Sequence, residues 1–184
     1  MTKAVDGSEW DIYLLAGISS TAAIFRECKR ELLRRFREAG REPVVRELLP
    51  YGDNSQSIVR QLLDVGSDLA RLRLPGRWRS GGKEAADEIR KFSLGRRVLL
   101  IGHSGGGVAA YEAAVLLRAE GAIRDFRIVM VGSPKVPIRM LPAERVSYFV
   151  AIDENGQQVD PVTRLGSWGG WARNGRGFFL LESV

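Results

Sequence analysis

The chain has 184 residues, of which 45% are hydrophobic, so it is long enough for one domain with a hydrophobic core. Its longest unbroken apolar runs fall far short of the ~20 residues that cross a bilayer. The first residues also lack the apolar segment of a secretory signal, so we expect no membrane span and a cytoplasmic location.

The formal net charge of +6 raises the question of nucleic acid as a partner. Much of the arginine lies in residues 25–41, where glutamates are interleaved. Glu31 precedes Arg34 and Arg35 by three and four residues, the spacing of ion pairs on a helix surface. A solvated helix face accounts for this charge. We find no nucleic-acid motif and expect no nucleic-acid partner.

Cys28 is the only cysteine, so neither an intramolecular disulfide nor a cysteine metal cluster can form. It shares a helical stripe with Ile24, Leu32 and Phe36, which favours an inert core thiol. No other ligand cluster stands out in the sequence. We therefore expect no metal and no organic cofactor.

Short β-type runs alternate with helical periods, a pattern typical of an α/β domain with a mostly parallel sheet and helices on both faces. The expected strands, in chain order, are 11–17, 43–49, 96–102, 126–132, 146–152 and 178–184. The expected helices are 21–39, one with an apolar stripe over 58–72, 85–92, and one from the glycine cluster at 105–107 to 120. The whole chain, residues 1–184, is predicted to form one domain.

Two segments rich in glycine, 73–83 and 166–177, are predicted to be surface loops. Both contain tryptophan. These loops are candidates for a partial lid or an apolar rim of a binding site, and simple packing anchors are the alternative.

The sequence Gly102-His103-Ser104-Gly105-Gly106 fits G-x-S-x-G directly after a buried strand and directly before a helix. At such a turn the serine is held in a strained conformation, with its hydroxyl above the sheet edge. Glycine two residues before and two residues after the serine keeps side chains from colliding with the strand and the helix. The pattern therefore predicts Ser104 as a nucleophile.

Acyl chemistry also needs two backbone N–H donors aimed at the developing oxyanion. Gly105, the residue after the nucleophile, is one candidate donor. The end of the first strand, at Gly17 and Ile18, supplies the second candidate because it opens directly onto a helix.

The order of these elements resembles the α/β-hydrolase superfamily, in its minimal lipase-like or esterase-like form without a cap domain. The resemblance covers nearly the whole chain. It implies a serine hydrolase whose acid follows the strand 146–152. Asp160, in Asp-Pro-Val, fits the family pattern and is favoured, whereas Asp153 lies closer to the strand end and is the alternative.

A catalytic triad of this kind also needs a histidine as base. The chain has one, His103, whose side chain we expect to point away from the Ser104 hydroxyl and to pack under the turn. In the family the catalytic histidine follows the last strand, where this sequence ends. Either the sequence is truncated just after that strand, or the triad is incomplete.

Three functions are compatible with these residues. The first is hydrolysis of a carboxylic ester or related acyl bond, in a small-molecule or lipid-like substrate, through an acyl-Ser104 intermediate. The second is a binding module with an incomplete hydrolase site. The third and least supported is nucleotide binding, because Gly105, Gly107 and Ala110 fit G-x-G-x-x-A but lack the acidic residue expected downstream.

Overall fold

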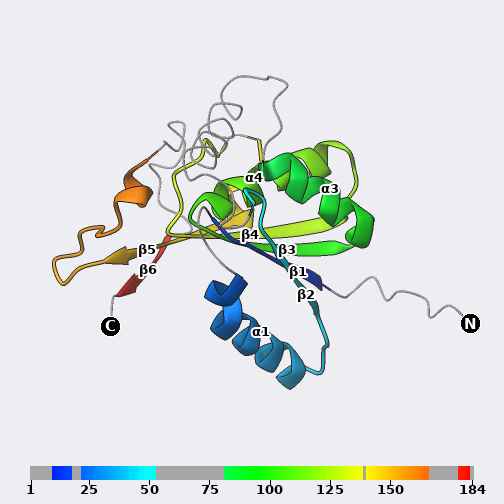
Figure 1. Cartoon of the computed structure of the whole chain (residues 1–184), viewed down its shortest axis with the longest axis horizontal. Coiled ribbons are helices and arrows are strands. Elements are labelled where there is room, and N and C mark those ends of the chain that lie inside the picture. The colour runs from blue at the N-terminus through cyan, green and yellow to red at the C-terminus, as the bar shows by residue number, and fades with distance from the viewer. Residues whose placement is uncertain (1–9, 18–21, 53–80, 139, 166–177, 183–184) are drawn as a thin grey trace, which may run out of the picture.

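The computed structural model describes residues 10–17, 22–52, 81–138 and 140–165 and the strand at 178–182. Its strands form one parallel sheet in the order β2-β1-β3-β4-β5-β6 (Figure 1). The strands are β1 (Trp10–Leu15), β2 (Val44–Leu48), β3 (Arg97–His103), β4 (Asp125–Val131), β5 (Val146–Ile152) and β6 (Phe178–Glu182). All six expected strands are confirmed.

The sheet has a switch point between β1 and β3. From β1 the chain moves outward to β2, then returns to the other side of β1 and proceeds from β3 to β6. In open α/β sheets, ligands bind outside the carboxyl ends of the strands at such a point. The end of β3, where the predicted nucleophile follows, lies there.

Helices cover both faces of the sheet, as predicted (Figure 1). The helices are α1 (Arg26–Glu38), α3 (Gly81–Ser93) and α4 (Gly105–Ala119), with short 3₁₀ turns η1 (Ala22–Phe25), η2 (Ala143–Arg145) and η3 (Pro161–Arg164). The expected helix at 58–72 lies outside the described residues. Within the described ranges, no helix is long and apolar enough to cross a membrane.

Alternate residues of β1 serve the two faces, because side chains of a strand point to opposite sides. Tyr13 and Leu15 join the core under α3 and α4, whereas Ile12 and Leu14 join the smaller core against α1. All four side chains are fully buried. β1 therefore contributes to both hydrophobic layers.

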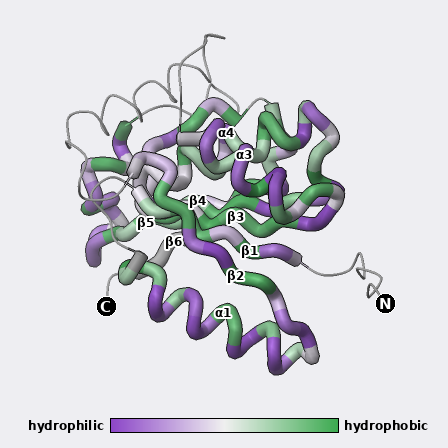
Figure 2. The backbone as a smooth tube through the Cα atoms, turned by 45° about the vertical axis from the view of Figure 1, so that its right-hand side comes forward, coloured by the Kyte–Doolittle hydropathy of each residue, from purple (hydrophilic) through white to green (hydrophobic). Residues whose placement is uncertain are grey.

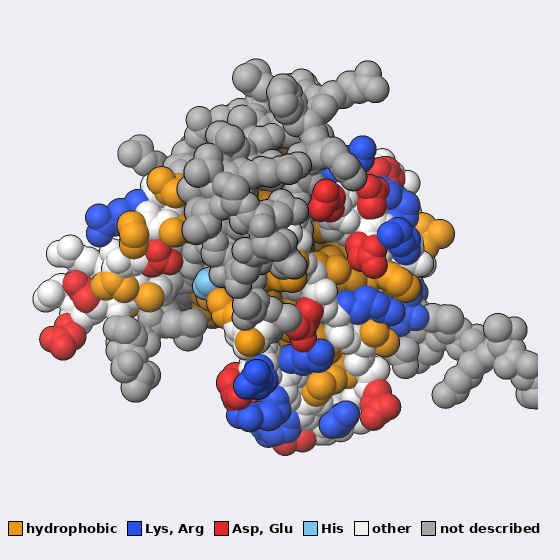
Figure 3. Space-filling view, in the orientation of Figure 1, with side chains coloured by type: hydrophobic (Ala, Val, Ile, Leu, Met, Phe, Trp, Pro, Cys, Tyr) orange, Lys and Arg blue, Asp and Glu red, His pale blue; other side chains and the backbone are white. Residues whose placement is uncertain are grey.

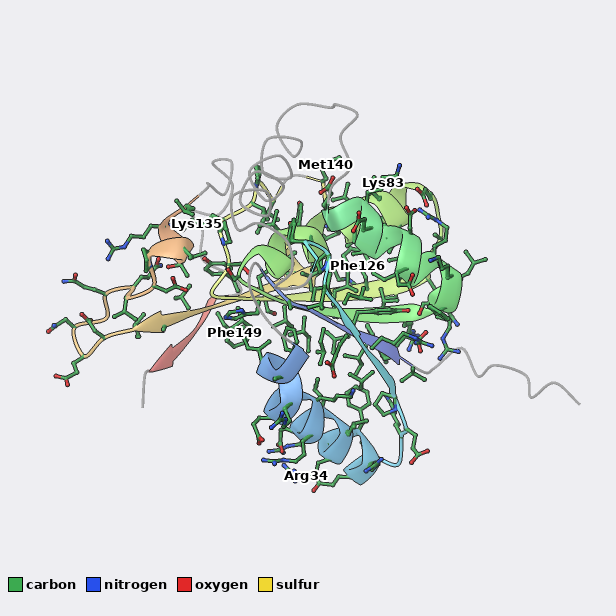
Figure 4. All side chains as sticks on the ribbon, viewed as in Figure 1. Arg34, Lys83, Phe126, Lys135, Met140 and Phe149 are labelled. Atoms are coloured by element: carbon green, nitrogen blue, oxygen red, sulfur yellow. The ribbon has the colours of Figure 1, made fainter. Side chains whose placement is uncertain are left out.

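The charged helix α1 has the ion pairs that the sequence predicts. Glu31 accepts hydrogen bonds from Arg34 at 2.5 and 2.8 Å and from Arg35 at 2.8 Å. These bonds, first from Arg34 and then from Arg35, lower the pKa of Glu31 to about 2. Figure 3 shows the charged side chains gathered on the outside of this helix, and Figure 4 places Arg34 across the sheet from Lys83 of α3.

Hydrophobic and hydrophilic residues alternate along α1 (Figure 2). Cys28, Leu32 and Phe36 pack against the smaller core, and burial raises the pKa of the Cys28 thiol, which supports an inert cysteine. The prediction for Ile24 was wrong: its side chain is 45% exposed. Ile24 precedes α1, in the turn η1, so the helical period does not extend to it.

The predicted loop 73–83 is wrong at its end, since residues 81–83 form the first turn of α3. The remainder of that loop lies outside the described residues. A Cβ at position 81 would lie 2.6 Å from the ring of Tyr51, and one at position 82 would lie 2.5 Å from a carboxylate oxygen of Glu112. Gly81 and Gly82 therefore serve close packing of α3.

A buried carboxylate ties together β1, α3 and the turn before β3. Asp11, only 2% exposed, accepts a hydrogen bond from the Ser93 hydroxyl at 2.5 Å and pairs with Arg96, whose Nε lies 2.7 Å away. The Tyr13 hydroxyl bonds the same serine oxygen at 2.6 Å. The charge is compensated inside the fold, so removing either partner would leave the other unpaired.

Replacing Asp11 with alanine should lower the free energy of unfolding by about 3–5 kcal/mol, because the Arg96 charge would remain partly buried without its partner. Urea denaturation followed by circular dichroism measures the change. Glu31→Ala is the matched control, since it also removes an arginine partner but at an exposed helix surface. Equal losses in the two variants would contradict the assigned importance of the buried pair.

Candidate active site

Ser104 occupies the turn between β3 and α4 in a strained conformation, with φ 54° and ψ −129°. It is the only non-glycine residue with positive φ in the part of the chain that the structure describes. Its N–H donates to the carbonyl of Val131 at 2.9 Å, and its own carbonyl accepts from the N–H of Gly107 at 3.0 Å. The strain is held in place by these bonds and by the packing around the turn.

The two glycines that flank the serine have the steric roles expected of them. A Cβ at position 102 would lie 2.3 Å from the carbonyl oxygen of Gly106. A Cβ at position 106 would lie 2.0 Å from the carbonyl oxygen of Leu15, the last residue of β1. Backbone atoms cannot yield at these distances, so both positions require glycine.

Two of the predicted oxyanion residues lie beside the serine. A Cβ at Gly17 would lie 2.8 Å from the Cβ of Ser104 and 3.0 Å from the backbone nitrogen of Gly105. Gly105 begins α4, and the first N–H groups of a helix have no partner within the helix. Ile18, the other predicted residue, lies outside the described residues.

The two candidate acids have different surroundings. Asp153 accepts hydrogen bonds through one oxygen from the N–H groups of Asn155 at 2.9 Å and Gln157 at 2.8 Å, so it closes a local turn. Asp160 caps the turn η3 by accepting from the N–H of Val162 at 2.9 Å. Its other oxygen lies near Gly132, 3.1 Å from where a Cβ would stand. Of the two candidate acids, Asp160 is therefore the one with an oxygen near the end of β4.

His103 lies on the opposite side of β3 from the Ser104 side chain. Its Nε2 is 3.9 Å from where a Cβ of Gly132 would stand, next to β4, whereas the Cβ of Ser104 lies next to Gly17 and β1. Burial lowers the pKa of His103, and the nearby Asp160 carboxylate acts in the opposite direction. This arrangement agrees with the expectation that His103 points away from the serine.

The sequence predicted no role for three residues at this edge: Gly132, Ser133 and Tyr148. Gly132, with φ 54°, lets the chain turn after β4 where His103 and Asp160 approach. Tyr148 donates from its hydroxyl to the carbonyl of Ser133 at 2.5 Å, and burial, together with Asp160, raises its pKa. Of these residues, only Gly132 could have been singled out from the sequence, as a glycine directly after a predicted strand.

The described residues give little support to a dinucleotide site or a metal site. The glycine at position 107, which suggested a dinucleotide fingerprint, is explained by packing, because a Cβ there would lie 2.0 Å from the Ser133 hydroxyl oxygen. Within the described ranges no group of three or more His, Cys, Asp or Glu side chains could hold a metal ion.

The sequence matches no protein-family model and no curated protein. Solved structures do match. The thioesterase RedJ from the prodiginine biosynthetic pathway of Streptomyces coelicolor is 16% identical, with a TM-score of 0.52 over 94% of this chain and 76% of RedJ. The fold is α/β-hydrolase-like.

Two further structures have the same fold. RedJ with a polyethylene glycol molecule in its active site gives a TM-score of 0.54 over 96% of this chain and 85% of RedJ, at 16% identity. ClbQ from the colibactin NRPS/PKS pathway gives 0.56 over 96% of this chain and 89% of ClbQ, at 14% identity. At this identity the likeness establishes the α/β-hydrolase-like fold, and any activity has to be argued from the site.

The free energy of unfolding of Ser104→Gly should exceed that of Ser104→Ala by about 1 kcal/mol. Alanine keeps the Cβ that makes this backbone conformation costly, whereas glycine has none. Both variants lack the hydroxyl, so the comparison isolates backbone strain. Urea unfolding of the two variants measures the difference. An alanine variant as stable as the glycine variant would show that the turn is unstrained.

Proposed function

We propose that this protein is a serine hydrolase that cleaves acyl thioesters through an acyl-Ser104 intermediate. The observation that carries the proposal is the strained serine at the end of β3, beside Gly17 and the backbone nitrogen of Gly105. The thioesterases among the structural neighbours support the thioester as the substrate bond. The sequence by itself favoured carboxylic esters, and this proposal places thioesters ahead of them.

In this mechanism the Ser104 oxygen attacks the acyl carbonyl carbon and gives up its proton to a base. The negative charge on the carbonyl oxygen is stabilised by the N–H of Gly105 and by a second donor from the segment at Gly17 and Ile18. Collapse of this intermediate breaks the carbon–sulfur bond and releases the thiol. Water then attacks the acyl-serine, which releases the carboxylic acid and restores the hydroxyl.

A thioester also requires less proton transfer from the described residues than an ester does. A departing alkoxide needs a proton from a general acid, the role of the histidine in a complete triad. A thiol has a pKa near 8.5, so it can leave as a thiolate with little help. Because His103 lies on the β4 side, away from Ser104, the described residues supply no histidine for that step.

The substrate site is proposed to be open, as in hydrolases without a cap. The connection between β4 and β5 lies against the body of the protein, where Val136 and Leu141 are buried. The Tyr111 hydroxyl of α4 also donates to the carbonyl of Pro137 at 3.2 Å. A small or lipid-like acyl group is the proposed substrate, and the partly buried, single Cys28 fits the reducing conditions of the cytoplasm.

A second candidate function is a binding protein with a hydrolase-like fold. The observation that favours it is again His103, the one histidine of the sequence, whose ring lies on the β4 side of the turn. Without a base a serine is a weak nucleophile, and an oxyanion hole with binding alone gives a residual rate of ~10³ to 10⁴ over water. The two candidates therefore differ in the reactivity of Ser104.

A fluorophosphonate probe should label the protein once per chain at Ser104, because the proposed mechanism requires an activated serine hydroxyl and the oxyanion donors would bind the phosphonyl oxygen. Intact mass spectrometry measures the added mass. Ser104→Ala should remain unlabelled. Ser93→Ala is the control and should be labelled as fully as the unaltered protein, because the Ser93 hydroxyl is buried and hydrogen-bonded to Asp11 and Tyr13. An unlabelled protein would favour the binding function.

Two substrates with the same acyl group, an N-acetylcysteamine thioester and an ethyl ester, should be hydrolysed at different rates. After correction for the spontaneous rates, kcat/KM should be at least about tenfold higher for the thioester. The reason is the lower pKa of the leaving thiol. Thiol release and acid release measure the two reactions, with Ser104→Ala as the control. A preference for the ethyl ester would contradict the thioesterase proposal and would indicate a carboxylic esterase.

A further inference from the structure

Three segments that are far apart in the sequence meet beyond the carboxyl end of β4. His103 ends β3, Gly132 follows β4, and Asp160 caps the turn η3 after β5. The Nε2 atom of His103 and the Oδ2 atom of Asp160 both lie within 4 Å of the point where a Cβ of Gly132 would stand, at 3.9 and 3.1 Å. The two side chains form no direct hydrogen bond in this structure, and glycine at position 132 adds no side chain that would keep them from approaching each other.

The two oxygens of Asp160 have separate surroundings. Oδ1 accepts from the N–H of Val162 at 2.9 Å, which fixes the carboxylate to its own turn. Oδ2 is the oxygen on the side of Gly132 and His103. One bond to the backbone leaves a carboxylate able to rotate about that contact. A second contact at Oδ2 would fix its plane.

The imidazole has the properties that such a contact needs. Its Nε2 faces the carboxylate side, and its Nδ1 is buried with no hydrogen-bond partner among the described residues. A neutral histidine carries one N–H and one acceptor nitrogen. A proton on Nε2 would serve Asp160 and would leave the unpartnered nitrogen as the acceptor, a less costly state for a buried atom than an unpartnered N–H.

We propose that His103 is a positioning residue that holds the Asp160 carboxylate at the carboxyl edge of the sheet through Nε2. This inference rests on the proposed function and adds to it the assignment of Asp160 as the acid of that site, which the Asp-Pro-Val segment and the position of Oδ2 favour. His103 acts on the acid from the β4 side, and the proton of Ser104 does not pass to it. The residue before the nucleophile thus links the turn at Ser104 to the loop after β5.

The first test needs no enzyme activity. His103 is the one histidine of the sequence, so protein without a histidine tag gives a single imidazole resonance in a ¹H NMR titration. Asp160→Asn should lower the pKa of His103, because the Asp160 carboxylate stabilises the imidazolium and opposes the effect of burial. Asp153→Asn should leave that pKa unchanged, since Asp153 holds only its own turn.

An unchanged titration in Asp160→Asn, or equal shifts in both variants, would overturn the proposal. Among the described residues, Asp160 also affects the pKa of Tyr148, whose hydroxyl donates to a backbone carbonyl and stays neutral over the range in which His103 titrates. The result is independent of turnover. It therefore distinguishes a failure of the pairing from a failure of the proposed thioesterase activity.

The second test compares two amides at position 103 in thioester hydrolysis. His103→Gln places an N–H near the former Nε2, whereas His103→Asn places it near the former Nδ1. Glutamine should retain most of kcat, and asparagine and alanine should lose about tenfold in kcat with KM unchanged. Equal kcat for glutamine and asparagine, or losses that follow thermal stability alone, would show a packing role and overturn the proposal.

Discussion

The close approach of α4 to the end of β1 is the contact on which the candidate site depends. The backbone of Gly106 comes so near the carbonyl of Leu15 that no Cβ fits between them, and a similar approach joins Gly102 to Gly106. Together these contacts set the angle between β3 and α4. That angle places the Cβ of Ser104 beside Gly17 and the first N–H groups of the helix.

Small residues extend this close packing along α4. Ala109, Ala110, Ala113 and Ala114 are all fully buried, and the helix packs against both the sheet and α3. A strained residue costs about 1–3 kcal/mol, and it persists only where the surrounding structure determines it. The buried layer under α4 provides that surrounding. At the far end of β1, the Asp11 and Arg96 pair holds α3 and β3 in the same unit.

The strand order decides which residues meet at the site. Because β1 and β4 flank β3, the segments that follow these strands reach the turn from two sides. Gly17 arrives from the β1 side with Ser104, and Gly132 arrives from the β4 side with His103 and Asp160. Ser104 and Asp160 thus lie toward opposite sides of β3.

The sequence by itself determined the α/β class, all six strands and the strained serine turn between β3 and α4, because strand periodicity and the glycines around Ser104 are local properties. It missed the start of α3 at Gly81, since those glycines read as loop and are required by contacts with Tyr51 and Glu112. Only the tertiary structure separated Asp153 from Asp160 and brought His103 to Gly132. These relations depend on strand order and on which side of β3 each segment approaches, and spacing along one chain does not encode them.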